Sequence, residues 1–423
     1  MRSLTALLLT VLATVGTCAQ SPSSPAEKNL SPAERSIARA KRLIAKNPKD
    51  FEAYNALALA LSRRARETSE VKFYAQAEEV LQRSFEISPG NFAGERTQVW
   101  LLLGKHEFAA AFEAAKKLNK KMPDDVMLYG FLTDANAELG NYTDAEAAAQ
   151  RMLDLRPGSI PALTRAAYLR ELFGDVDGAL DLMEMAYEST PLSESEDRAW
   201  ILTQLAQLNL TVGRGSQAES LLQQALTMFP GYHYALGNLA KVRIQQKRYA
   251  EAVEMLKQRY QAAPHPENLY ELADALQLAG RTEEANQAFA EFEQKSLVES
   301  HRADNSNHEL TFYYADHANQ PNKALEVAKR EFARRHDVYT LDSYAWALHV
   351  NGQSEEASKQ IDAALAVGIR NARLFRHAGE IALQCGDGAK AQKYLEQSAE
   401  LNTSDSELAR TKLASMAQAP MLQ

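Results

Sequence analysis

The sequence predicts an all-α protein in which about ten helix–turn–helix units stack into one solenoid. Two periodic sets of residues support this prediction. Alanines recur at intervals of 33 or 34 residues, with two intervals of 39, at Ala77, Ala111, Ala145, Ala179, Ala218, Ala252, Ala285, Ala324, Ala357 and Ala391. Prolines recur in the same register, mostly 34 residues apart, at Pro48, Pro89, Pro123, Pro157, Pro191, Pro230 and Pro264. A fixed period of this length is typical of repeat architectures, whose units bury their apolar faces only by stacking on neighbours.

The elements of each unit follow from its residue types. A polar residue such as Asp50, Asn91, Asp125 or Ser159 precedes the first helix, where its side chain can accept a hydrogen bond from a free N–H group. A glycine, for example Gly140, ends that helix because it adopts the left-handed conformation of a helix C-terminus. The second helix contains the alanine of the register, which lets the two helices pack closely. The proline then ends the unit, because it disfavours α geometry in the preceding residue.

Two segments show this pattern most completely, ALGNLAKVRIQQKRYAEAVEMLKQRYQAAP (235–264) and LDSYAWALHVNGQSEEASKQIDAAL (341–365). A 34-residue helix–turn–helix unit of this kind resembles the tetratricopeptide repeat. The resemblance covers nearly all of residues 50–403 and implies one right-handed α-solenoid, or superhelix, over 51–403. It also implies a concave groove that binds other proteins or peptide segments.

Some segments depart from the regular repeat. An insertion around Arg64–Val71 interrupts the first repeat, and we expect insertions of this size to lie in loops. The eighth repeat, around His308–Ala333, matches the pattern poorly. We expect residues 31–50 to form an unpaired leading helix. We expect residues 404–418 to form a C-terminal capping helix, with a capping box made by Ser404 and Glu407.

The N-terminus predicts export. Arg2 precedes an apolar run from Leu4 to Val15, and small residues follow at Thr17 and Ala19. This pattern predicts a signal peptide over residues 1–19, followed by a flexible linker over 20–30. The expected location is therefore periplasmic or secreted. An alternative interpretation makes VGTC a lipobox, in which case the protein is an envelope lipoprotein lipidated at Cys18.

Composition argues against several function classes. The formal net charge of −8 disfavours binding to nucleic acid, which needs a basic face. The sequence contains no motif of a metalloprotease, a serine hydrolase or a P-loop enzyme, so no cofactor and no metal is predicted. Residues 173–184 resemble a calcium loop, but Phe173 stands where the first aspartate ligand is needed. Cys385 is predicted to be a small buried residue.

The groove should be lined by first-helix residues that point away from the packing between helices. Two such columns lie eleven and eighteen residues before the register alanines. The first contains Trp100, Asp134, Tyr168, Gln207, Lys241, Asp274, Tyr313, Trp346 and Glu380, and the second includes Trp200, Tyr234, Tyr339 and Arg373. Aromatic rings concentrate at binding hot spots. The candidate binding residues are therefore Trp100, Tyr168, Trp200, Tyr234, Tyr313, Tyr339 and Trp346. The alternative is that these rings brace adjacent repeats.

These observations predict a noncatalytic scaffold, adaptor or assembly chaperone of the cell envelope that binds a protein segment in its groove. The alternative is a catalytic or small-ligand-processing protein with a site in the groove or in the 294–322 stretch.

Overall fold

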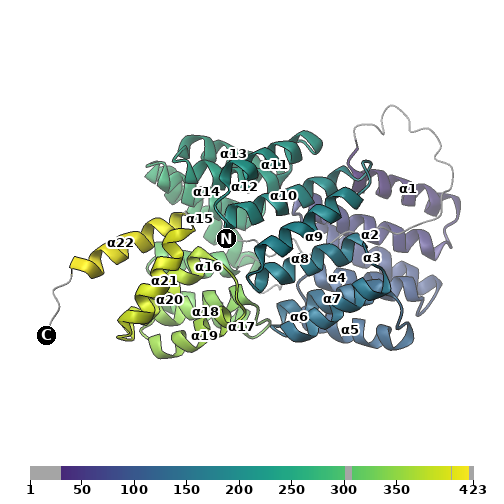
Figure 1. The fold of residues 1–423 in the computed structure, drawn as a ribbon. Helices are drawn as coiled ribbons and strands as arrows, with labels where there is room; N and C mark the ends of the chain where they lie inside the picture. Colours follow the sequence, from purple (N-terminus) through teal and green to yellow (C-terminus); the bar gives the residue numbers. More distant parts are fainter. Residues whose placement is uncertain (1–29, 301–306, 402, 419–423) are drawn as a thin grey trace.

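The computed structural model describes residues 30–300, 307–401 and 403–418. The predicted signal peptide, the lipobox cysteine and nearly all of the predicted linker lie outside these ranges. Within them the chain folds into α-helices and one short π-helix, and no strand is present. The predicted all-α solenoid is confirmed (Figure 1).

The helices follow one another with short connections along the whole described chain. In order they are α1 (Pro32–Lys46), α2 (Phe51–Thr68), α3 (Lys72–Ile87), α4 (Phe92–Gly104), α5 (Phe108–Lys121), α6 (Val126–Glu138), α7 (Tyr142–Leu155), α8 (Ile160–Leu172), α9 (Val176–Ser189), α10 (Ser195–Thr211), α11 (Gly215–Met228), α12 (His233–Gln245), α13 (Tyr249–Ala262), α14 (Pro266–Leu278), α15 (Thr282–Glu299), α16 (Asn307–Phe312), the π-helix η3 (Tyr313–His317), α17 (Pro321–Phe332), α18 (Val338–Val350), α19 (Ser354–Ala366), α20 (Ala372–Gln384), α21 (Gly388–Glu400) and α22 (Ser404–Gln418).

Consecutive helices pack as pairs, from α2 with α3 to α20 with α21. The described ranges thus contain ten pairs, preceded by α1 and followed by α22. Each register alanine lies in the second helix of its pair and is at most 1% exposed. The recurring alanine is therefore the point of closest packing between the two helices, because a larger side chain would push them apart.

Side-chain caps begin many of the first helices. Asp50 accepts a hydrogen bond from the Ala53 N–H at 3.1 Å, and Asn91 accepts one from the Gly94 N–H at 2.7 Å. Asp125 caps α6 in the same way. The predicted cap at Ser159 is wrong, because its side chain makes no cap hydrogen bond and α8 begins instead with a proline in its first turn.

The helices at the two ends of the solenoid have caps of their own. Ser31 and Glu34 form a capping box at the start of α1. At the start of α22 the reciprocal cap joins Thr403 and Ser406, one residue earlier than predicted, with N···O distances of 3.0 and 3.2 Å. Glu407 instead forms an ion pair with Lys247, at 3.0 Å between Oε1 and Nζ.

The insertion in the first repeat is helical, which corrects the expectation of a loop. It extends α2 to Thr68. The extension brings Arg66 against the start of α10, where its guanidinium pairs with Glu196 and lies 3.0 Å from Asp197 Oδ1. Both carboxylates and Arg66 are buried. The extra turn therefore joins the first repeat to the fifth.

A second contact of this type joins the third repeat to the end of the eighth. Arg335 Nη1 lies 3.4 Å from Glu138 Oε2, although the two residues are 197 positions apart in the sequence. The His336 N–H also donates to the Glu138 carbonyl at 3.1 Å. In Figure 1, α17 accordingly lies beside α6. The superhelix is wound so tightly that its successive turns touch.

Candidate functional site

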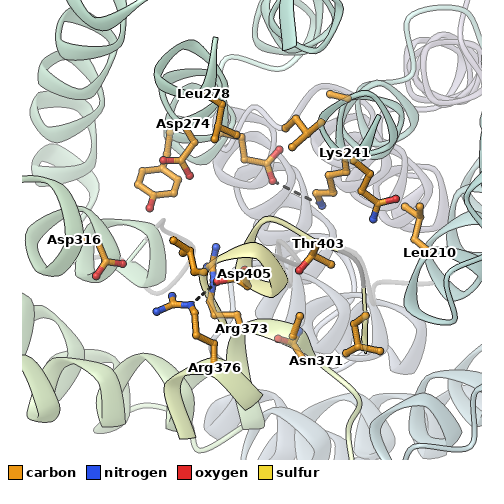
Figure 2. Close-up of a pocket in the computed structure, with 18 of the residues that line it drawn as sticks. Leu210, Lys241, Asp274, Leu278, Asp316, Asn371, Arg373, Arg376, Thr403 and Asp405 are labelled. Atoms are coloured by element: carbon orange, nitrogen blue, oxygen red, sulfur yellow. Dashed lines mark hydrogen bonds and ion pairs between the residues drawn. The ribbon is translucent and has the colours of Figure 1, made fainter. Parts of the chain in front are cut away.

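The inner face of the C-terminal half encloses a pocket of about 840 Å³. Its walls come from the first helices of successive repeats, α10, α12, α14, α18 and α20, together with η3 and the first turns of α22. Figure 2 shows labelled side chains from α10, α12, α14, η3 and α20 around one space, with Thr403 and Asp405 at the start of α22 between them. Volumes of this size are typical of ligand clefts.

One wall of the pocket contains a chain of ion pairs. Lys241 Nζ lies 3.9 Å from Glu271 Oε1, and Glu271 also pairs with Arg259. Burial alone would raise the pKa of Glu271, but Arg259 and Lys241 together lower it below its ordinary value. Glu271 is therefore a fixed negative charge, while the Lys241 side chain is part-exposed toward the pocket.

The π-helix η3 places two adjacent polar side chains in the pocket. His317 Nε2 lies 3.1 Å from Asp274 Oδ1 and 3.5 Å from the Tyr270 hydroxyl. The next residue back, Asp316, accepts a hydrogen bond from Trp346 Nε1 at 2.7 Å. π-Helices often occur at functional sites. Here the 294–322 stretch contributes directly to the pocket through Ala315, Asp316 and His317.

The opposite wall contains two arginines of α20 that meet a carboxylate of α22. Arg376 Nε lies 2.9 Å from Asp405 Oδ1, and Arg373 Nε lies 3.6 Å from Asp405 Oδ2. Burial would raise the pKa of Asp405, but the two guanidinium groups hold it well below its ordinary value. Asp405 is therefore ionised inside the pocket.

Trp346 is held between two polar neighbours. Its ring stacks on His377 with centroids 4.1 Å apart and planes 12° from parallel, while its indole N–H donates to Asp316. His377 Nε2 accepts from Arg376 at 2.9 Å, because arginine can only donate. The other nitrogen, Nδ1, therefore carries the proton and donates to Asp342 at 2.7 Å. This network fixes the ring at the pocket wall.

Of the seven aromatic residues predicted to bind a partner, Trp346 alone lines this pocket. Five of the seven rings, Trp100, Tyr168, Trp200, Tyr234 and Trp346 itself, are buried, so the expectation that they point away from the packing between helices is wrong for these five. Trp100 shows the reason. Its indole N–H donates to Ser62 of α2 at 2.8 Å, and its ring lies beside the Phe131 ring of α6, with the two ring centroids 6.0 Å apart. Adjacent first helices pack so closely that an inner-face ring fills the space between them. A direct role for these rings in partner binding stays a prediction.

Tyr313 and Tyr339 are half-buried. Tyr313 stacks on Phe289 with ring centroids 5.5 Å apart, and its hydroxyl lies 3.5 Å from Glu293.

The polar members of the two columns mark the pocket better than the aromatic ones. Gln207, Lys241 and Asp274 lie eleven residues before their alanines and Arg373 lies eighteen before, and all four line the pocket. Sequence reasoning missed Asp316, His317, Arg376 and Asp405. The first two sit in the π-helix, which has no sequence signature here. Arg376 stands one helical turn after Arg373, a spacing that could have indicated it.

The described ranges contain no group of His, Cys, Asp and Glu that could hold a metal ion. In the calcium-like loop, Asp175 accepts from the Gly178 N–H at 3.0 Å and begins α9. Cys385 is exposed, contrary to its predicted burial, because it is the C-cap residue of α20, and its thiol donates to the Ser354 carbonyl at 3.4 Å. None of the helices in these ranges combines the length and apolarity of a membrane span.

Family models for the tetratricopeptide repeat match two segments, residues 97–160 and 209–264. The matched segments contain the register alanines Ala111, Ala145, Ala218 and Ala252. This chain is a tetratricopeptide repeat protein. The repeat identity explains why successive first helices form the inner face of the solenoid, and why the pocket is assembled from several repeats.

Several solved structures are similar to this tetratricopeptide repeat protein. Human IFIT1, in a dimer with m7Gppp-AAAA, superposes with a TM-score of 0.50 and 14% identity over 87% of this chain and 85% of that chain. Yeast Tom70 gives a TM-score of 0.35 and 14% identity over 85% and 96% of the two chains. The pilus biogenesis factor PilW gives 0.41 and 12% over 47% and 91%. No curated protein sequence matches the chain. The likeness to IFIT1 concerns the fold alone.

Proposed function

We propose that this tetratricopeptide repeat protein is a noncatalytic scaffold, an adaptor or assembly chaperone, that binds a segment of another protein in its inner pocket. The observation that supports this most directly is the composition of the pocket. First helices of several successive repeats present charges of both signs beside apolar side chains such as Leu278, which is 43% exposed, and the terminal helix α22 adds Leu408, which is 56% exposed. Exposed large apolar side chains in a cleft indicate a binding surface.

The arrangement suits a polypeptide better than a single charged group. Lys241 and Arg370 offer positive charge, whereas Asp274 and Asp316 offer negative charge, at separate places along the same pocket. A peptide segment presents charged, polar and apolar side chains in succession, so it can match such a surface along its length. Each matched pair adds specificity through charge complementarity.

We also propose that the protein works in the cell envelope, which rests on the sequence of residues 1–19 alone. In a Gram-negative host the mature chain should begin at Gln20 and occur in the periplasm. Mass spectrometry of the purified protein checks this. A diacylated Cys18 would instead establish the lipoprotein alternative.

The binding proposal is tested by photo-crosslinking in the native cell. A photoreactive amino acid replaces Gln277, an exposed residue of the pocket, or Gln224, an exposed residue of the second helix α11. The proposal expects a discrete crosslinked protein from position 277 and none from position 224. Equal crosslinking from both positions, or none from position 277, would contradict it.

A further inference from the structure

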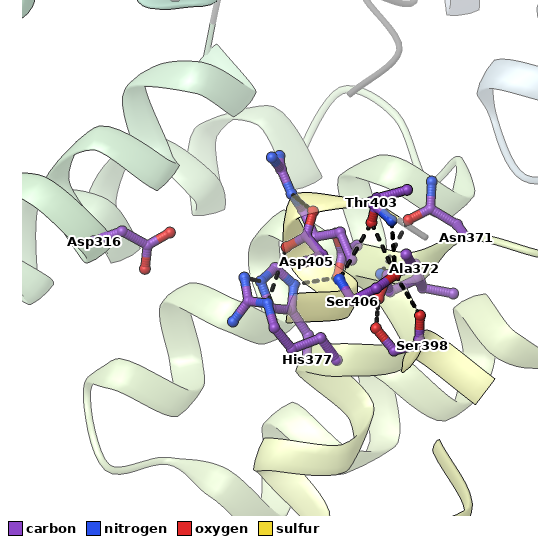
Figure 3. Close-up of polar contacts among 12 residues, drawn as sticks. Asp316, Asn371, Ala372, His377, Ser398, Thr403, Asp405 and Ser406 are labelled. Atoms are coloured by element: carbon purple, nitrogen blue, oxygen red, sulfur yellow. Dashed lines mark hydrogen bonds and ion pairs between the residues drawn. The ribbon is translucent and has the colours of Figure 1, made fainter. Parts of the chain in front are cut away.

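One side chain inside the pocket belongs to the terminal helix rather than to a repeat. Asp405 of α22 reaches Arg373 and Arg376 of α20, which both belong to the last repeat (Figure 2). Figure 3 shows Asp405 beside Thr403 and Ser406 at the start of the terminal helix. Asp405 lies in the first turn of α22, so the acidic group enters the pocket at the very start of the helix. An acidic side chain of the chain itself thus occupies a pair of arginines that face the proposed partner site.

Asp405 satisfies the two arginines unequally. Arg376 is fully engaged, because it donates to Asp405 at 2.9 Å, to Glu380 at 2.8 Å and to His377 at 2.9 Å. Arg373 approaches Asp405 only at 3.6 Å, and its guanidinium lies 4.7 Å above the Phe312 ring. Its buried Nη1 has no hydrogen-bond partner among the residues that the structure describes. Buried donors are nearly always paired, so Arg373 retains capacity for another acceptor.

The helix that supplies Asp405 is held by few strong contacts. Ser406 Oγ donates to the Ser398 carbonyl at 2.5 Å, Arg410 Nη2 donates to the Ala399 carbonyl at 2.5 Å, and Ala409 is buried, but most of α22 after Ala409 is exposed. The ion pair between Glu407 and Lys247 joins two side chains that are 53% and 67% exposed, and exposed pairs contribute little to stability. The main packing partners of α22 are α21 and α20 of the last repeat. Because a solenoid unit depends mainly on its direct neighbours, we expect the repeats to stay folded when α22 is released.

We propose that Arg373 and Arg376 form a carboxylate-binding subsite, that Asp405 occupies it in the free chain, and that an acidic side chain of the bound partner segment replaces Asp405 as α22 leaves the pocket. This inference rests on the proposed function, because it names the chemistry of the partner at that same pocket. The partner segment then has an Asp or Glu that meets Arg373 with both carboxylate oxygens, a geometry that Asp405 does not reach.

Occupation by the chain itself has a measurable consequence. A tethered group competes at an effective concentration that reaches the millimolar range for short connections, so Asp405 suppresses binding of any external acidic segment. Asp405→Asn removes the competing charge and leaves both arginines in place. Glu407→Gln is the matched control, since it removes an acid of the same helix that pairs outside the arginine site.

The experiment uses the full chain and a fluorescein-labelled synthetic peptide with the sequence of residues 403–418, TSDSELARTKLASMAQ, measured by fluorescence anisotropy. The D405N chain should bind this peptide at least about tenfold more tightly than the wild-type or E407Q chain. The same peptide with Asn in place of its aspartate should bind the D405N chain no more tightly than the wild-type chain. Adding Arg373→Gln to the D405N chain should abolish the gain, with circular dichroism confirming that each variant is folded.

Equal affinity of the wild-type and D405N chains, or equal binding of the aspartate and asparagine peptides, would overturn the inference. The probe is the chain's own segment, so this result does not depend on a cellular partner. If position 277 captures no protein while the peptide behaves as expected, the proposed function fails and the carboxylate subsite stands. If position 277 captures a protein while the D405N chain binds the peptide no more tightly than the wild-type chain, the proposed function stands and the carboxylate subsite fails.

Discussion

Gly174 and Gly368 touch through their backbones, although they belong to the fourth repeat and to the connection between the ninth and the tenth. A Cβ placed on Gly174 would lie 2.6 Å from the Gly368 carbonyl oxygen, and a Cβ on Gly368 would lie 2.8 Å from the Phe173 carbonyl oxygen. Neither position has room for a side chain. The glycines thus allow the fourth repeat to meet the connection between the ninth and the tenth repeat.

Replacing Gly174 with alanine should therefore destabilise the protein more than the same change at Gly213, which ends the corresponding helix of the next repeat. Both glycines have positive φ, 82° and 76°, so both variants lose about 1 kcal/mol from backbone strain. A Cβ at Gly213 would meet nothing within 4 Å, whereas Gly174→Ala must displace a carbonyl and should lose about 1–3 kcal/mol more. Urea unfolding of both variants measures the difference. Equal losses would mean that the turns do not touch in solution.

Arg66→Ala tests the other contact between turns, where the extended α2 meets α10. The change leaves Glu196 and Asp197 buried with less compensating charge, so the free energy of unfolding should fall by about 3–5 kcal/mol. The control is Arg83→Ala, which removes an exposed pair with Glu86 and should leave the free energy of unfolding nearly unchanged. Chemical denaturation at fixed pH measures both. A small loss for Arg66→Ala would show that the first and fifth repeats are not joined.

Two buried histidines predict loss of stability in mild acid. Burial lowers the pKa of His233 to about 3, and burial together with Arg335 lowers the pKa of His308 to about 3. Both stabilising contributions are complete above the unfolded pKa of about 6.5 and are lost as pH falls toward 3, because only the unfolded chain takes up the protons. Each histidine contributes a slope of up to about 1.4 kcal/mol per pH unit in this window.

The measurement compares wild type with His233→Gln by urea unfolding between pH 7 and pH 4.5. The difference isolates the histidine, because the raised pKa values of Asp134 (about 6) and Asp197 (about 7) act in the opposite direction in both proteins. The stability gap between wild type and variant should narrow as pH falls. A gap that is independent of pH would show that His233 is not buried as a neutral ring.

Trp200→Ala distinguishes a ring that braces the repeats from one that binds a partner. Trp200 is 4% exposed, so its truncation should lower the free energy of unfolding by about 3–5 kcal/mol. Leu192→Ala, at a residue 84% exposed in the preceding connection, should change it by less than about 0.5 kcal/mol. Thermal and chemical unfolding measure both variants. A stable Trp200→Ala protein that has lost affinity for its partner would restore the groove role of this ring.

The periodic alanines predicted the repeats because close packing within a pair depends on neighbouring residues alone. Counting eleven residues back from each register alanine also identified Lys241 and Asp274, which line the pocket. The same spacing gave a wrong prediction at Asp134, which stands in this column but is buried and accepts hydrogen bonds from Arg165, with N···O distances of 2.6 and 2.8 Å. Whether a column position faces a pocket or a neighbouring helix depends on local side-chain size and charge, which spacing does not encode.

Contacts between turns were not predictable from the repeat pattern. Arg66, Gly368 and Glu138 each meet residues more than a hundred positions away, and their partners are set by the pitch of the superhelix. Pitch accumulates from small rotations between repeats. The place of Asp405 in the pocket depends on the same accumulated geometry.

Hydrogen exchange on the chain with and without the protein captured from position 277 tests the central claim most directly. If a partner segment occupies the inner pocket, amide protection should increase over the pocket-facing ends of α12, α14 and α20, near residues 241–245, 270–278 and 371–376. The outer helices α11 and α15, which contribute no residue to the pocket, should exchange at unchanged rates. Protection confined to those outer helices, with the pocket segments unaffected, would contradict binding in the pocket.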